Sequence, residues 1–80
     1  ASPTREDAAR LLLAGPRVRR KHVQYWVVLA FERLLERNLV APEQRPEIRS
    51  LLDLYDRTAD DALRRLLNSV RASLSRPAPV

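Results

Sequence analysis

Apolar residues recur at intervals of three and four along most of the chain, a spacing that predicts helices. The longest such series extends from Ile48 to Leu74 and keeps the phase of an α-helix throughout. Alternating apolar and polar runs of useful length are absent, as are the dipeptides typical of hairpins. The pattern therefore predicts an all-α fold: a small bundle of three helices, or of four if the longest series is interrupted.

Glycine and proline divide the chain into the expected helices. The single glycine and its neighbour, Gly15 and Pro16, suit the end of one helix and the first turn of the next. Thr4 and Asp7 match a capping box at the start of the first helix. We expect helices at about residues 4–14, 16–38 and 46–75, with the two longer helices packed antiparallel.

The interval 46–75 admits a second interpretation. Thr58 and Asp61 have the spacing of another capping box, so a new helix can begin after a break near residues 57–58. Because the apolar phase is unbroken across this point, the pattern favours one continuous or gently kinked helix. Its outer side carries three acid-before-base pairs at i,i+4, which also favour helix: Asp53 with Arg57, Asp60 with Arg64, and Asp61 with Arg65.

The segment 16–38 is apolar on more sides than one partner helix can cover. One face, centred on Val27, is expected to meet the segment 46–75, with Trp26 on one flank of that face, whereas Tyr25 and Leu29 lie toward the opposite side. Either the short first helix covers these three side chains as core, or they form a contact patch for another chain, because interfaces favour aromatic residues. The second interpretation predicts a protein interface made of Tyr25, Trp26, Leu29, Leu12, Leu13 and Leu54.

Length and composition limit the organisation of the chain. Its 80 residues contain no cysteine, so we expect one domain without disulfides. The ends, residues 1–3 and 76–80, have the composition of linkers, which predicts a single domain at 4–75 excised from a larger protein. The lack of cysteine favours the cytoplasm or nucleus over secretion. The longest apolar run, Tyr25 to Phe31, is too short to span a bilayer.

Most of the net charge of +5 is concentrated at the start of the second predicted helix. There Arg17, Arg19, Arg20 and Lys21 have no acid among them and oppose the helix dipole. One interpretation is anion binding, to a nucleic-acid backbone or, less favoured, to an anionic membrane surface. The favoured interpretation is a solvated turn, or one paired with acids of the connection or of the last helix.

Base reading in a major groove has little support. The first helix, Gly15 and the second helix could form a helix-turn-helix, with the arginines entering the groove. However, the first turns of the second helix contain a single amide, Gln24, and no asparagine.

Residues for catalysis or metal binding are sparse. The only histidine, His22, has no serine or acid at a motif spacing. Asp53, Asp56 and Asp60 share one side of a helix, but the arginines at i+4 from two of them favour a solvated face over a metal site. The chain has no Gly-rich phosphate loop and no His/Cys set for zinc. We therefore predict no enzyme, no metal and no cofactor.

The leading functional hypothesis is a non-catalytic helical module that docks another protein or its own copy through the predicted interface. The alternative is a nucleic-acid-binding module in which Arg17, Arg19, Arg20 and Lys21 bind the phosphates. Contact with an anionic membrane surface is the least favoured of the three.

Overall fold

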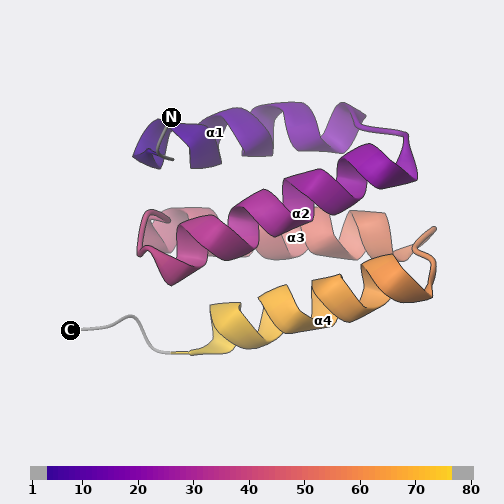
Figure 1. Ribbon diagram of the computed structural model, residues 1–80. Coiled ribbons are helices and arrows are strands. Elements are labelled where there is room, and N and C mark those ends of the chain that lie inside the picture. The colour runs from indigo at the N-terminus through magenta and orange to yellow at the C-terminus, as the bar shows by residue number, and fades with distance from the viewer. Residues whose placement is uncertain (1–3, 77–80) are drawn as a thin grey trace.

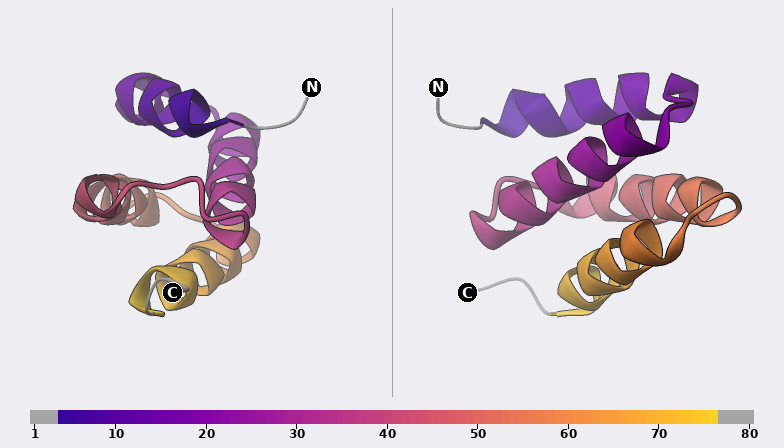
Figure 2. Two further views of the ribbon diagram at one scale, coloured as in Figure 1. Left: turned by 90° about the vertical axis from the view of Figure 1, so that its left-hand side faces the viewer. Right: turned by 45° about the vertical axis from the view of Figure 1, so that its right-hand side comes forward.

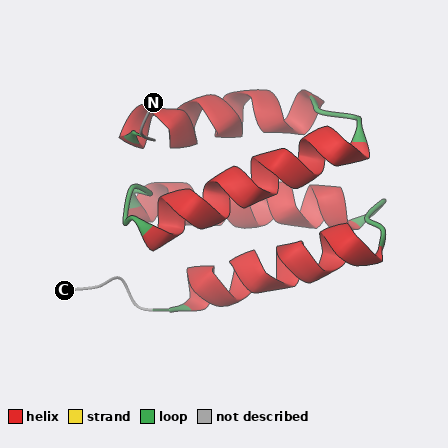
Figure 3. Cartoon of the chain, viewed as in Figure 1, coloured by secondary structure: helices red, strands yellow, loops and turns green. Residues whose placement is uncertain are grey.

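The computed structural model describes residues 4–76. Within that range the chain forms four α-helices and no strand (Figures 1 and 3). The helices are α1 (Arg5–Ala14), α2 (Lys21–Glu36), α3 (Arg45–Asp56) and α4 (Asp61–Ser75), with the 3₁₀ turns η1 (Gly15–Arg17) and η2 (Pro42–Gln44) in the connections. The predicted all-α bundle is confirmed in its four-helix form. The predicted linkers, residues 1–3 and all of 76–80 except Arg76, lie outside the described range.

The core lies between α2, α3 and α4. Helices α2 and α4 have the most extensive contact, α3 packs against both, and α1 lies at the edge of the bundle against α2 and α3 (Figures 1 and 2). The largest fully buried side chains come from the three central helices: Phe31, Leu34, Ile48, Leu52, Tyr55, Leu63, Leu67, Val28 and Val70. Of the helices in residues 4–76, none combines the length and the apolar character needed to cross a membrane.

The ends of α1 are fixed by the residues that the pattern indicated. The backbone N–H of Thr4 donates to Asp7 Oδ2 at 2.8 Å, which is one half of the predicted capping box. Gly15 follows α1 as its C-cap, but with φ −52° and ψ −45° it stays in the right-handed region. A Cβ at this position would lie 2.6 Å from Leu51 Cδ2 of α3. A larger residue would force the Leu51 side chain to shift, so glycine permits the close packing of the chain against α3.

A buried hydrogen bond ties the end of α1 to α3. The hydroxyl of Tyr55, whose side chain is almost fully buried, donates to the backbone carbonyl of Gly15 at 2.7 Å. Burial of the phenol raises the pKa of Tyr55 to about 12. The same carbonyl accepts from the backbone N–H of Val18 at 3.1 Å. These contacts fix the turn from which α2 begins.

Helix α2 begins at Lys21, so the prediction of a start at residue 16 is wrong. Pro16 opens the short turn η1, and Val18 then takes an extended conformation with φ −73° and ψ 123°. Val18 packs against the core, and its carbonyl accepts a hydrogen bond of 3.1 Å from Gln24 Nε2. The helix cannot begin until the chain has passed this inward-packed residue.

The end of α2 agrees better with the pattern. Asn38 has a positive φ of 55°, and its N–H donates to the carbonyl of Leu35 at 3.1 Å. The N–H of Leu39 donates to the carbonyl of Leu34 at 2.8 Å. Together these bonds form a Schellman motif, in which asparagine takes the left-handed position.

The segment 46–75 is divided by a break at residues 57–60, so the preference for one continuous helix is wrong. The break near 57–58, which was the alternative, is present. The N-cap of α4 is Asp60, whose Oδ1 accepts from the N–H of Leu63 at 2.8 Å. A continuous helix over residues 45–75 would be about 46 Å long, whereas the longest extent of the molecule is 35 Å. The break folds the segment back so that both halves reach one core.

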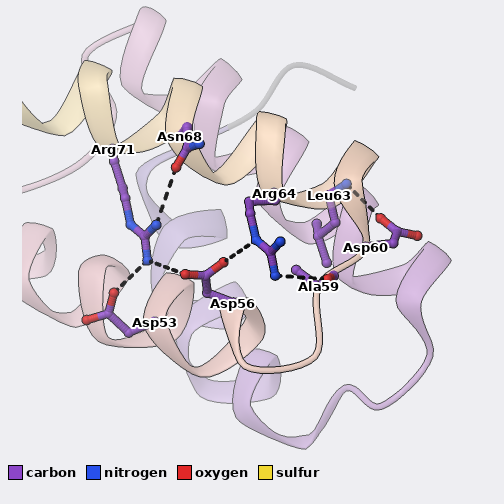
Figure 4. Close-up of polar contacts among 8 residues, drawn as sticks. All are labelled: Asp53, Asp56, Ala59, Asp60, Leu63, Arg64, Asn68 and Arg71. Carbon is purple, nitrogen blue, oxygen red and sulfur yellow. Dashed lines mark hydrogen bonds and ion pairs between the residues drawn. The ribbon is translucent and has the colours of Figure 1, made fainter.

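The hairpin of α3 and α4 is joined by ion pairs across the two helices (Figure 4). Arg71 Nη2 of α4 lies 2.7 Å from Asp53 Oδ1 and 3.5 Å from Asp56 Oδ2 of α3. Its hydrogen bond to Asp53 is the main cause that raises the pKa of Arg71. Arg64 Nε lies 3.3 Å from Asp56 Oδ1.

None of the three predicted i,i+4 pairs is among the ion pairs of residues 4–76. The break accounts for two of them, because it brings Asp53 of α3 next to Arg71 of α4 and uses Asp60 as a cap; it does not account for Asp61 and Arg65, which both lie in α4.

Candidate functional site

The outward side of α2 carries an uncovered aromatic patch, which we define as Tyr25, Trp26 and Leu29. The rings of Tyr25 and Trp26 meet edge to face, with centroids 6.4 Å apart and planes at 89°. Trp26 is 63% exposed and Tyr25 is 38% exposed. Leu29 is half-buried. It follows Tyr25 by four residues and Trp26 by three, so it lies on the same side of the helix.

Helix α1 does not enclose this patch. The inward residues of α1 are Ala8, which is fully buried, and the half-buried Leu11 and Leu12. The buried residues of α2 are Gln24, Val27, Val28, Phe31 and Leu34, and the patch lies on the other side of that helix. The interpretation of Trp26 as plain core, covered by the first helix, therefore does not describe this structure.

The other predicted interface residues lie elsewhere. Leu12 and Leu54 line an open groove between α1 and α3, with a volume of about 620 Å³. Pro16 and Leu51 contribute further apolar lining, and its charged and polar residues are Glu47, Ser50, Asp53 and Arg57. Leu13 is 81% exposed and is not among the residues of the groove. The six residues thus do not form one continuous surface. The pattern did not indicate the groove, because it depends on how α1 crosses α3.

The basic cluster, defined as Arg17, Arg19, Arg20 and Lys21, lies just before and at the start of α2. Because the helix begins at Lys21, three of the four cations precede it, so the cluster opposes the helix dipole less than the sequence predicts. All four residues are exposed. Among the ion pairs of residues 4–76, none involves any of them. The predicted pairing with acids of the connection or of the last helix is therefore not seen there.

The side chain of Gln24 is buried and hydrogen-bonded within the fold, and it is not part of the surface. The residue is 6% exposed, and its Nε2 donates to Val18. Its Oε1 has no hydrogen-bond partner within the described part of the chain. Because this amide is enclosed beneath the turn, it cannot read the edge of a base without leaving the core. The sequence does not distinguish this buried role from an exposed one.

The candidate residues for catalysis or metal binding are separated from one another or already paired with other groups. His22 is exposed on α2. Asp53 and Asp56 contact arginines of α4, and Asp60 caps that helix. Residues 4–76 contain no group of three or more His, Asp or Glu side chains that could hold a metal ion. The distinctive surfaces of the described chain are therefore the aromatic patch, the adjoining basic cluster and the groove between α1 and α3.

Comparison of the chain with models of known protein families, with curated proteins and with solved structures finds no match.

Proposed function

We propose that this chain is a non-catalytic docking module that binds a protein through the aromatic patch on α2. The observation that carries the proposal is the 63% exposure of Trp26 on a bundle whose core is filled without it. Tryptophan and tyrosine are enriched among the residues that dominate binding energy at protein interfaces. The patch also offers Leu29 one helical turn beyond the two rings, so a partner would meet a continuous apolar surface.

The energy available from this patch is large enough to matter. A tryptophan presents up to about 250 Å², so the exposed part of Trp26 amounts to roughly 150 Å². At about 25 cal/mol per Å², covering it would contribute roughly 3 to 4 kcal/mol before the costs of association are subtracted. That is the size of a dominant interface contact.

The proposal is tested by comparing the chain with three variants. Trp26→Ala and Leu29→Glu disrupt the patch, and Leu13→Ala removes an apolar side chain that is more exposed but lies outside it. Solution mass is first measured over a concentration series, since self-association raises it above the 9.2 kDa of one chain. Each protein is then immobilised and used to capture partners from the source cell.

The result expected is a dimer or a captured protein that the parent chain and Leu13→Ala both retain and that both patch variants lose. Equal retention by all four proteins would refute the role of the patch. A monomer that captures nothing specific would refute the docking function.

A second candidate function, nucleic-acid binding, is favoured by one observation: the basic cluster is exposed and carries no ion pair within residues 4–76. Phosphate contacts by these four side chains would make the affinity for a generic duplex fall steeply with salt. The double variant Arg19→Ala with Arg20→Ala should then weaken binding and flatten the salt dependence. Binding that does not respond to salt would eliminate this candidate.

A further inference from the structure

We infer that the aromatic patch and the basic cluster form one surface, and that its partner is an acidic amphipathic helix of another protein. The inference rests on the proposed docking function and adds the chemistry of the partner. It is carried by the position of the cluster beside the patch and by the absence, among residues 4–76, of acids that form ion pairs with it.

The basic cluster adjoins the patch through Lys21, the one member of the cluster that lies on α2. Lys21 precedes Tyr25 by four residues, so the two share one side of the helix a single turn apart. Arg33 follows Leu29 by the same spacing and is exposed. The apolar middle of the outward face is therefore bordered by cations at its N-terminal end, and at its C-terminal end by Arg33 with the exposed Glu36 beside it.

Three acids of the described residues are engaged elsewhere, and within residues 4–76 the exposed Glu36, Glu43 and Glu47 form no ion pair with the basic cluster. Glu32 on α2 accepts a hydrogen bond of 3.0 Å from Ser69 of α4. Asp53 and Asp56 bind Arg71, and Asp56 also binds Arg64. The basic cluster is left for a partner, and the positive end of the α2 dipole adds to its attraction for negative charge.

A second copy of the chain is a poor match for the surface. Between residues 17 and 37 the chain has six cations, which are Arg17, Arg19, Arg20, Lys21, Arg33 and Arg37, against two acids, Glu32 and Glu36. Two such faces placed together would bring a surplus of positive charge from each side, whatever the direction of the helices. An isologous contact therefore leaves the cluster unneutralised, and like charges at an interface oppose association.

A nucleic acid fits the cluster but not the rest of the surface. Phosphates could bind the four cations, and a base could stack on Trp26. Leu29 offers no stacking face, and the nearby amide of Gln24 is buried. Four other arginines bond within the protein: Arg45 and Arg49 donate to the carbonyl of Leu74, and Arg64 and Arg71 bind aspartates. A helix with apolar residues at i, i+3 and i+4 and a run of acids at one end satisfies the patch and the cluster together.

Binding can be followed at the site itself, because Trp26 is the only tryptophan of the chain. The probe is a tryptophan-free amphipathic peptide of about 20 residues, with leucines along one face and glutamates at one end. Matched peptides replace the glutamates by glutamine or the leucines by serine, and a single-stranded oligonucleotide supplies phosphates without a helix. Each is titrated into the chain at about 50 mM and about 500 mM NaCl.

The acidic amphipathic peptide should shift the emission of Trp26 to shorter wavelength and bind at least about tenfold more tightly at low salt than the glutamine peptide. The variant Arg19→Ala with Arg20→Ala should lose that difference. The control Arg65→Ala, an exposed arginine of α4, should keep it. The serine peptide should bind weakly and leave the emission unshifted, since it cannot cover the indole.

Equal affinity for the glutamate and glutamine peptides would overturn the acidic partner while leaving docking through the patch intact. Tighter binding of the oligonucleotide than of any peptide would overturn the inference in favour of nucleic acid. No change in Trp26 emission with any peptide would also overturn it, and the proposed docking function is then decided by the capture experiment with Trp26→Ala.

Discussion

The hydrogen bond between Tyr55 and Gly15 gives a quantitative test of how α1 is held. Tyr55→Phe removes the hydroxyl that donates at 2.7 Å and leaves the ring in place. The carbonyl of Gly15 still accepts from the N–H of Val18, so it is not left without a partner. The loss should therefore be that of one ordinary hydrogen bond, about 1 kcal/mol, and not the larger penalty for an orphaned buried group.

Urea unfolding at neutral pH measures this loss. For a chain of this size the free energy of unfolding falls by about 1 kcal/mol per M urea, so the midpoint should fall by about 1 M. Tyr25→Phe is the matched control, since it removes the only other tyrosine hydroxyl, which belongs to the exposed patch. An unchanged midpoint for Tyr55→Phe, or an equal fall for both variants, would refute the role assigned to the bond.

The pH dependence tests the same bond independently. Burial raises the pKa of Tyr55 in the folded chain from 10.0 to about 12, so folding favours the neutral phenol. This contribution is fully present below about pH 10 and is lost as the pH rises through about 12, roughly 2 to 3 kcal/mol in all. Tyr55→Phe cannot titrate there, so its stability should overtake that of the parent chain between those pH values. A constant stability difference from about pH 9 to about pH 12 would contradict the assignment.

Three further predictions concern the hairpin of α3 and α4. Asp60→Ala should lower the free energy of unfolding by about 1 kcal/mol through loss of the cap. The neighbouring Asp61 makes no capping bond, so Asp61→Ala should change the free energy of unfolding by less than about 0.5 kcal/mol. Thermal denaturation followed by circular dichroism compares the two variants. Leu67→Ala should cost about 2 to 5 kcal/mol because this side chain is fully buried, whereas Ala62→Ser, at an exposed position, should cost less than about 0.5 kcal/mol in urea unfolding. In a single continuous helix Ala62 would face the core and Leu67 would face solvent, so Ala62→Ser would then cost more stability than Leu67→Ala. Arg71→Ala should cost about 0.5 to 1 kcal/mol in dilute buffer, and the difference should shrink in about 0.5 M NaCl, since its pairs are partly exposed; a loss that is independent of salt would argue against an electrostatic contribution.

The fold class follows from the sequence because helical periodicity and capping signals agree along the chain. Gly15 ends α1 where the pattern placed the end, and Asp7 makes its capping bond. The break in the longest segment could not be read in the same way. Leu66 and Leu67 are neighbours, so an unbroken helix that buries Leu66 and a broken one that buries Leu67 both show an apolar stripe. Only the packing of α4 against α2 decides between them.

Only part of the candidate site could be predicted, because its exposure also depends on how the helices pack. The sequence indicates that Tyr25 and Leu29 lie on the side of α2 opposite the residues expected to meet the third helix, with Trp26 on the flank of that face. Whether α1 covers that side depends on the angle at which α1 enters the turn. The close approach of Gly15 to Leu51 sets that angle. Such a contact, between residues 36 positions apart, produces no periodic pattern in the sequence. The groove at Leu12 and Leu54 arises from the same crossing.

Because α1 lies at the edge of the bundle, it is held less tightly than the other three helices. Ala8 is the only fully buried side chain that this helix contributes, and the hydroxyl of Tyr55 fastens its last turn. Detaching α1 would thus break less extensive contacts than separating α2 from α4. The amide protons of α1 should exchange with solvent through a partial opening, well before the whole chain unfolds, and they would then report a separate and smaller free energy than those of α2.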